Sequence, residues 1–102
     1  MKLVLVASIA LLCSACVVTR QTAVSLATEE ITRRKLPLPK QYVIEADYGC
    51  VVGQPTVHFW TVMFRASDSK TLLYTVWVND SKPVVDAMLD SRHDEYIRIY
   101  PR

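Results

Sequence analysis

Glycine and cysteine are scarce in this chain, and neither sign of charge dominates. Its 102 residues include 2 glycines, 3 cysteines, 12 basic residues and 10 acidic residues. Two isolated glycines exclude a glycine-rich phosphate-binding loop, and the near balance of charge gives no electrostatic reason to expect nucleic-acid binding. A chain of this length forms one domain at most, with little room for a deep active-site cavity.

Motifs for catalysis and metal binding are also missing. The two histidines, His58 and His93, have no second histidine or cysteine at zinc-ligand spacing. The triplet His93-Asp94-Glu95 has metal-ligand chemistry but is more typical of a solvated turn. Cys50 could pair with a histidine as a nucleophile, although nothing near it in the sequence supports that role. We therefore expect no enzyme activity, no metal and no cofactor; an enzyme using either histidine with carboxylates is the disfavoured alternative.

The first fifteen residues have the three regions of an export signal. Lys2 supplies a positive start, residues 3–12 are almost entirely apolar, and residues 13–15 are small. The apolar run is shorter than the roughly 20 residues that span a bilayer, so an uncleaved membrane anchor over residues 3–18 is the less favoured interpretation. We therefore expect cleavage after Ala15.

Residues 12–16 read Leu-Cys-Ser-Ala-Cys and resemble the lipobox of bacterial lipoproteins, in which a small residue precedes the modified cysteine. The resemblance implies a lipid on Cys16. Because Val17 follows and not aspartate, it also implies an outer-membrane anchor facing the periplasm. The alternative is a secreted or periplasmic soluble protein, in which Cys16 and Cys50 are free to form a disulfide. The expected partners are the membrane, through the lipid anchor, and an envelope protein.

Hydropathy periodicity predicts one helix and four strands in the rest of the chain. Apolar residues at helical spacing favour a helix over residues 22–36, ended by Pro37 and Pro39. The basic run at residues 33–35 suits the end of that helix and is also able to contact anionic lipid or a partner. Residues 84–89 fit a short helix starting at Pro83 slightly better than a strand. Alternation or β-branched content predicts the strands, at residues 42–48, 56–66, 71–78 and 96–100.

These elements predict an α+β fold in which one N-terminal helix packs on a four-stranded antiparallel sheet. The short uncertain element precedes the last strand, and the expected organisation is an export signal at 1–15, a tether at 16–21 and one domain at 22–102. The helix ending at Leu36-Pro37, the strand from Tyr42 and the hairpin around Trp60 and Trp77 resemble small cystatin-like, PepSY-like or immunity-type modules of bacterial envelopes.

Aromatic side chains on the two central strands are the candidate binding residues. Trp60 and Trp77 lie on adjacent predicted strands, and with Phe64 they form either core beneath the helix, which we favour, or an exposed binding surface. We therefore expect a non-enzymatic protein-interaction module: an inhibitor, an immunity factor or an assembly accessory. The alternative is a small-ligand binder whose pocket, between helix and sheet, is lined by Tyr42, Tyr48, Trp60 and Trp77.

Overall fold

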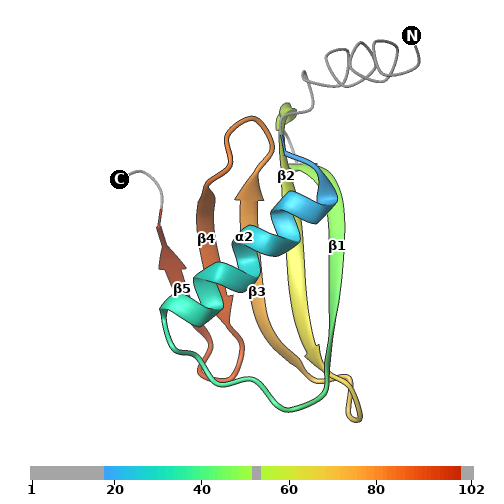
Figure 1. The fold of residues 1–102 in the computed structure, drawn as a ribbon. Helices are drawn as coiled ribbons and strands as arrows, with labels where there is room; N and C mark the ends of the chain where they lie inside the picture. Colours follow the sequence, from blue (N-terminus) through green and yellow to red (C-terminus); the bar gives the residue numbers. More distant parts are fainter. Residues whose placement is uncertain (1–17, 52–53, 100–102) are drawn as a thin grey trace, which may run out of the picture.

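The computed structural model describes residues 18–51 and 54–99, which form one helix and five strands (Figure 1). The predicted export signal and Cys16 lie outside the described residues. Cleavage after Ala15 and lipidation of Cys16 therefore stay predictions. The elements in chain order are α2 (Arg20–Arg33), β1 (Tyr42–Val51), β2 (Gln54–Ala66), β3 (Leu72–Asn79), β4 (Val85–Asp90) and β5 (Glu95–Arg98).

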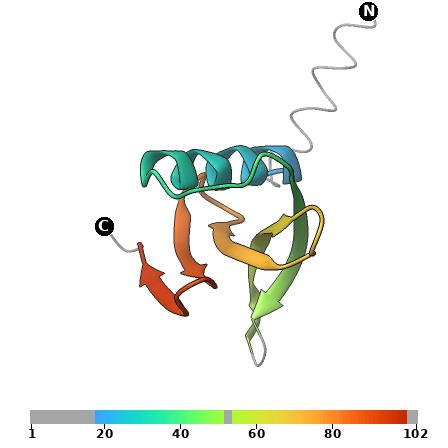
Figure 2. The same cartoon turned by 90° about the horizontal axis from the view of Figure 1, so that it is seen from below.

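The strands form one open antiparallel sheet in which each strand pairs with its neighbour in the chain, in the order β1-β2-β3-β4-β5. Helix α2 crosses one face of this sheet diagonally and contacts β1 to β4 (Figures 1 and 2). The predicted α+β class, with one N-terminal helix on an antiparallel sheet, is confirmed. The expected number of strands is wrong, because the sheet has five strands and not four.

The additional strand is β4, where a short helix was favoured over residues 84–89. Its pairing with β3 changes register between Trp77–Ala87 and Val78–Val85, so Asp86 is an extra residue, a β-bulge. The bulge allows both Val85 and Met88 to be buried in the core beneath α2. Their spacing of three residues imitates a helical repeat, which explains why the sequence pattern favoured a helix.

The helix begins two residues earlier than expected. Thr19 is its N-cap, and the Thr19 Oγ1 accepts a hydrogen bond from the Thr22 backbone N–H at 3.2 Å. Arg20 and Gln21 therefore belong to α2 and not to a tether. Val18, immediately before the cap, is 3% exposed and packs in the core. Residues 18–21, which the sequence analysis assigned to a tether, therefore belong to the described fold.

The helix also ends earlier than expected, in a left-handed turn before the prolines. Lys35 has φ = 57°, and its N–H donates to the Thr32 carbonyl at 3.0 Å, while the Leu36 N–H donates to the Ile31 carbonyl at 3.1 Å. This is the Schellman arrangement, in which glycine is the usual left-handed residue. In this glycine-poor chain a lysine takes that position.

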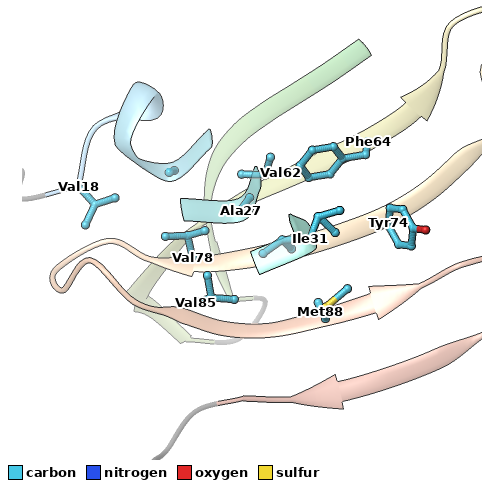
Figure 3. Close-up of a cluster of buried hydrophobic side chains, with 11 residues drawn as sticks. Val18, Ala27, Ile31, Val62, Phe64, Tyr74, Val78, Val85 and Met88 are labelled. Carbon is cyan, nitrogen blue, oxygen red and sulfur yellow. The ribbon is translucent and has the colours of Figure 1, made fainter. Parts of the chain in front are cut away.

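The core lies between α2 and the sheet face that it covers (Figure 3). The helix contributes the small residues Ala23 and Ala27 together with Ile31, and all three are buried. The buried apolar residues contributed by the sheet to this cluster are Val62, Phe64, Tyr74, Val76, Val78, Val85 and Met88.

No described helix is both long enough and apolar enough to cross a membrane.

Candidate functional site

Trp60, Phe64 and Trp77 do not form one surface. Trp60 lies opposite Val78 and Trp77 lies opposite Thr61, so the alternation of side chains along a strand places the two tryptophans on opposite faces. Phe64 is fully buried beneath α2 (Figure 3). Trp60 is half-buried on the same face, whereas Trp77 lies on the uncovered face. The two tryptophans therefore share neither one core position beneath the helix nor one exposed surface.

The face of the sheet turned away from α2 carries a group of aromatic side chains. Figure 2 shows that no described element covers this face. Trp77 and Tyr96 lie with their ring centroids 6.0 Å apart and their planes at 54°, and Tyr96 is 55% exposed. We call this surface the open face. Its centre is a shallow hollow of about 280 Å³, lined by Phe59, Trp77, Asp86, Ala87 and Tyr96.

The β4 bulge supplies the polar group of the open face. Asp86 is the inserted residue, and its Oδ2 accepts a hydrogen bond from the Asn79 Nδ2 at 3.4 Å. Phe59 lies directly across the ladder from Asn79. The hollow therefore combines three aromatic walls with a carboxylate at its border. Such a lining suits a partner's side chain that is apolar along its length and polar at its tip.

A second aromatic group lies on the covered face, at the end of the sheet where the helix starts. The rings of Tyr48 and His58 are stacked at 5.4 Å with an interplanar angle of 6°, and the rings of Tyr48 and Trp60 are 5.1 Å apart. The Tyr48 hydroxyl donates to Asp80 Oδ2 at 2.8 Å, and the Trp60 Nε1–H donates to the Val18 carbonyl at 2.9 Å. We call Tyr48, His58 and Trp60 the aromatic end cluster.

His58 and Cys50 are cross-strand neighbours in the β1–β2 ladder. The His58 ring stacks on Tyr48, however, and no hydrogen bond joins it to the Cys50 thiol in the described part of the chain. Cys50 is exposed and free. The pair is adjacent but is not arranged as a base and its nucleophile. The alternative Cys16–Cys50 disulfide involves a residue outside the described ones.

The His93-Asp94-Glu95 triplet lies at the turn between β4 and β5. His93 Nδ1 is 3.4 Å from Asp90 Oδ2, while Asp94 and Glu95 are exposed. Within residues 18–51 and 54–99, no group of three histidine, cysteine, aspartate or glutamate residues is placed to hold a metal ion. The triplet is part of a turn whose buried member is Asp90, a residue that the sequence patterns did not single out.

Asp90 is held by a two-bond ion pair with Arg92. The Arg92 Nε and Nη2 donate to the two carboxylate oxygens of Asp90 at 3.0 and 2.7 Å. Hydrogen bonding to the Arg92 side chain lowers the pKa of Asp90 to about 2, against the opposing effect of burial. The Arg92 guanidinium also lies 5.2 Å from the centroid of the Tyr74 ring. Burial is the main cause of a raised pKa at the Tyr74 phenol. The Asp90–Arg92 ion pair and the Arg92–Tyr74 contact hold β3 next to the β4–β5 turn. We therefore assign these residues a role in stability.

The basic run at the end of α2 is paired within the helix. The buried Glu30 carboxylate accepts from the Arg33 guanidinium and from the Arg34 Nε, the latter at 2.6 Å. Lys35 is the exposed left-handed residue that ends the helix. Two of the three cations therefore compensate a buried charge of their own helix.

The four residues expected to line a pocket between helix and sheet do not converge. Tyr42 packs against Phe64, with ring centroids 6.2 Å apart, at the end of β1 where the aromatic end cluster does not reach. Trp77 is on the open face. The space beneath the helix is filled by fully buried core side chains (Figure 3).

No protein-family model matches this chain, and the searches of curated proteins and of solved structures also gave no match. Two exposed features stand out in the described residues: the open face and the aromatic end cluster.

Proposed function

We propose that this chain is a small exported envelope lipoprotein that acts as a non-enzymatic protein-interaction module, and that the open face binds its partner. One observation carries the proposal: helix α2 covers one face of the sheet, while the opposite face displays Phe59, Trp77 and Tyr96 around a hollow. Aromatic anchors that fill or line a pocket dominate the binding energy of many protein interfaces. The module acts as an inhibitor, an immunity factor or an assembly accessory.

The geometry of the open face supports a protein partner. Its aromatic rings are held on paired strands, so they present a fixed shape at a small entropic cost. Tyr96 is more than half exposed, and a partner that covers it removes apolar ring surface from water. Asp86 adds a polar residue to the otherwise apolar lining of the hollow.

The envelope location belongs to the same proposal. The lipobox-like residues 12–16 support a lipid on Cys16, facing the periplasm from the outer membrane. Val18, two residues after Cys16, is buried in the core and bonded to Asp80. The finer likeness to cystatin-like, PepSY-like or immunity-type modules is also part of the proposal, and the helix before an antiparallel meander supports it.

Site-specific photocrosslinking in cells tests the open face. A benzophenone amino acid replaces Tyr96 in the full-length chain expressed in a bacterial host. The matched control carries the same group at Tyr48, which is 52% exposed on the opposite face, close to the 55% of Tyr96. We expect a covalent protein adduct from position 96 and none of the same mass from position 48. The absence of an adduct at position 96, or the same adduct from both positions, would contradict the proposal.

Once the adduct identifies the partner, truncation of the same residue measures its contribution. Tyr96→Ala removes an exposed ring and leaves the buried core intact, so the fold is preserved. We expect the dissociation constant to rise about ten-fold, as for an interface anchor worth 1–2 kcal/mol. Tyr48→Ala is the control and leaves the affinity unchanged. Titration of the purified partner by calorimetry gives both values.

A further inference from the structure

Val18, the first residue that the structure describes, lies two residues after the proposed lipid attachment point, Cys16. The Val18 N–H donates to the Asp80 carbonyl at 3.3 Å, and the Val18 carbonyl accepts from the Trp60 Nε1–H at 2.9 Å. The Val18 side chain is 3% exposed, and Thr19 caps the helix that follows. Both polar groups of the Val18 backbone are therefore fixed, one by Trp60 of β2 and the other by Asp80, the residue that follows β3.

This attachment leaves very little chain between the lipid and the fold. The Cα atoms of Cys16 and Val18 are two residues apart, and two residues span at most about 7 Å even when fully extended. A long flexible tether would allow the domain to stand away from the membrane in any orientation. Two residues do not allow this, so the end of the sheet that holds Val18 must lie close to the bilayer surface.

The aromatic end cluster is located at that end. Trp60 contacts Val18 directly, Tyr48 packs against Trp60, and the Tyr48 hydroxyl is tied to Asp80. Tryptophan and tyrosine are enriched at membrane–water interfaces because their rings are apolar and their N–H or O–H groups are polar.

Two exposed cations also lie at this end of the domain. Arg20 is the first residue of α2, two residues after Val18, and Lys82 lies in the connection between β3 and β4, two residues after Asp80. Both cations suit a surface that carries anionic lipids.

We infer that the aromatic end cluster lies against the headgroup layer of the bilayer that holds the Cys16 lipid, so that the strands rise from the membrane. The inference rests on the lipid anchor of the proposed function. In this orientation the β2–β3 turn, with Ser69, is at the membrane-distal end (Figure 1). The open face is turned sideways, where a periplasmic partner has access to it.

The native Cys50 provides a reporter for this orientation. It follows Tyr48 by two residues in β1 and is exposed. In the lipidated chain the signal takes Cys13 away and the lipid blocks the Cys16 thiol, so Cys50 is the one free thiol of the sequence. A nitroxide attached to Cys50 therefore reports on the end that we place at the membrane.

The experiment uses the full lipidated chain in vesicles of phosphatidylethanolamine and phosphatidylglycerol. Power-saturation EPR measures collisions of the nitroxide with an aqueous nickel chelate and with membrane-soluble oxygen. The matched control, Cys50→Ser with Ser69→Cys, carries the label at the distal turn. We expect nickel accessibility at position 50 to fall several-fold on reconstitution, relative to a soluble chain from residue 17 onward, and accessibility at position 69 to stay unchanged.

Two negative outcomes are distinguishable. Intact mass first establishes whether the vesicle-bound protein begins at Cys16 with added acyl mass; its absence overturns the anchor and with it the inference. If the anchor is present and the labels at positions 50 and 69 are equally accessible to nickel, the inference alone is overturned. In that case the lipoprotein proposal is unaffected.

Discussion

Replacing Asp90 by asparagine removes a buried charge while keeping the shape of the side chain. Asp90 is 4% exposed, and both of its carboxylate oxygens accept hydrogen bonds from the Arg92 guanidinium. Its Oδ1 also accepts from the Arg92 backbone N–H at 3.0 Å. Asparagine retains an acceptor oxygen for the backbone bond, so Asp90→Asn isolates the contribution of the ion pair.

The expected magnitude follows from the pKa of Asp90. Hydrogen bonding to the Arg92 side chain is the main cause that lowers it from 3.8 to about 2. The lowering from 3.8 to about 2 corresponds to about 2 kcal/mol of stability. Because Arg92 and His93 are partly in solvent, screening reduces the expected value to about 1–2 kcal/mol. The folded carboxyl is more acidic than the unfolded one, so this contribution is present above about pH 4 and is lost as the pH falls towards 2.

Urea unfolding followed by tryptophan fluorescence measures this effect on the chain from residue 17 onward. At pH 7 we expect Asp90→Asn to lower the free energy of unfolding by about 1–2 kcal/mol. Between pH 4 and pH 2 the difference from the unmodified chain should shrink. Asp68→Asn, which changes an exposed carboxylate in the β2–β3 turn, is the control and leaves the midpoint nearly unchanged. Equal midpoints for Asp90→Asn and the unmodified chain at pH 7, or a difference independent of pH, would refute the reasoning.

Two further substitutions test contacts that hold the helix and the segment after it. Tyr74→Phe removes the hydroxyl that donates to the Pro37 carbonyl at 2.6 Å, and we expect a loss of about 1 kcal/mol in urea unfolding, together with faster amide exchange at Leu36 and Leu38. Thr19→Ala removes the N-cap of α2, and we expect a loss of about 1 kcal/mol, with Thr19→Ser as the control that retains the cap; an unchanged midpoint in either case would contradict the assigned contact.

The sequence patterns predicted the elements better than the register between them. The strands expected at residues 42–48, 56–66 and 71–78 correspond to β1, β2 and β3, and the C-terminal strand corresponds to β5. The error at β4 has a local cause, because the bulge at Asp86 aligns Val85 and Met88 on one face. Periodicity assumes an unbroken strand, so it does not detect an inserted residue.

The position of Trp60 and Trp77 on opposite faces of the sheet depends on a second register shift, between β2 and β3. Phe64 pairs with Tyr74 but Arg65 pairs with Leu72, so Leu73 is an extra residue beside the β2–β3 turn. The faces within each strand follow from the sequence alone, but the alignment of two strands depends on such a shift, and one residue of slip turns every side chain to the other face.

The ion pair of Asp90 with Arg92 was missed because charged residues in a predicted turn give no sign of burial.

The nearest-neighbour order of the strands has a consequence for the folding pathway. Every strand pairing joins segments that are adjacent in the chain, so the sheet can grow one hairpin at a time with little loop-closure cost, a topology associated with rapid folding. The bonds that Val18 makes with Asp80 and Trp60 are different, since they join the start of the described chain to the middle and late parts of the sheet. We therefore expect the helix and Val18 to dock on a sheet that has already formed. The contacts that hold the domain close to the proposed lipid anchor would then be among the last to form.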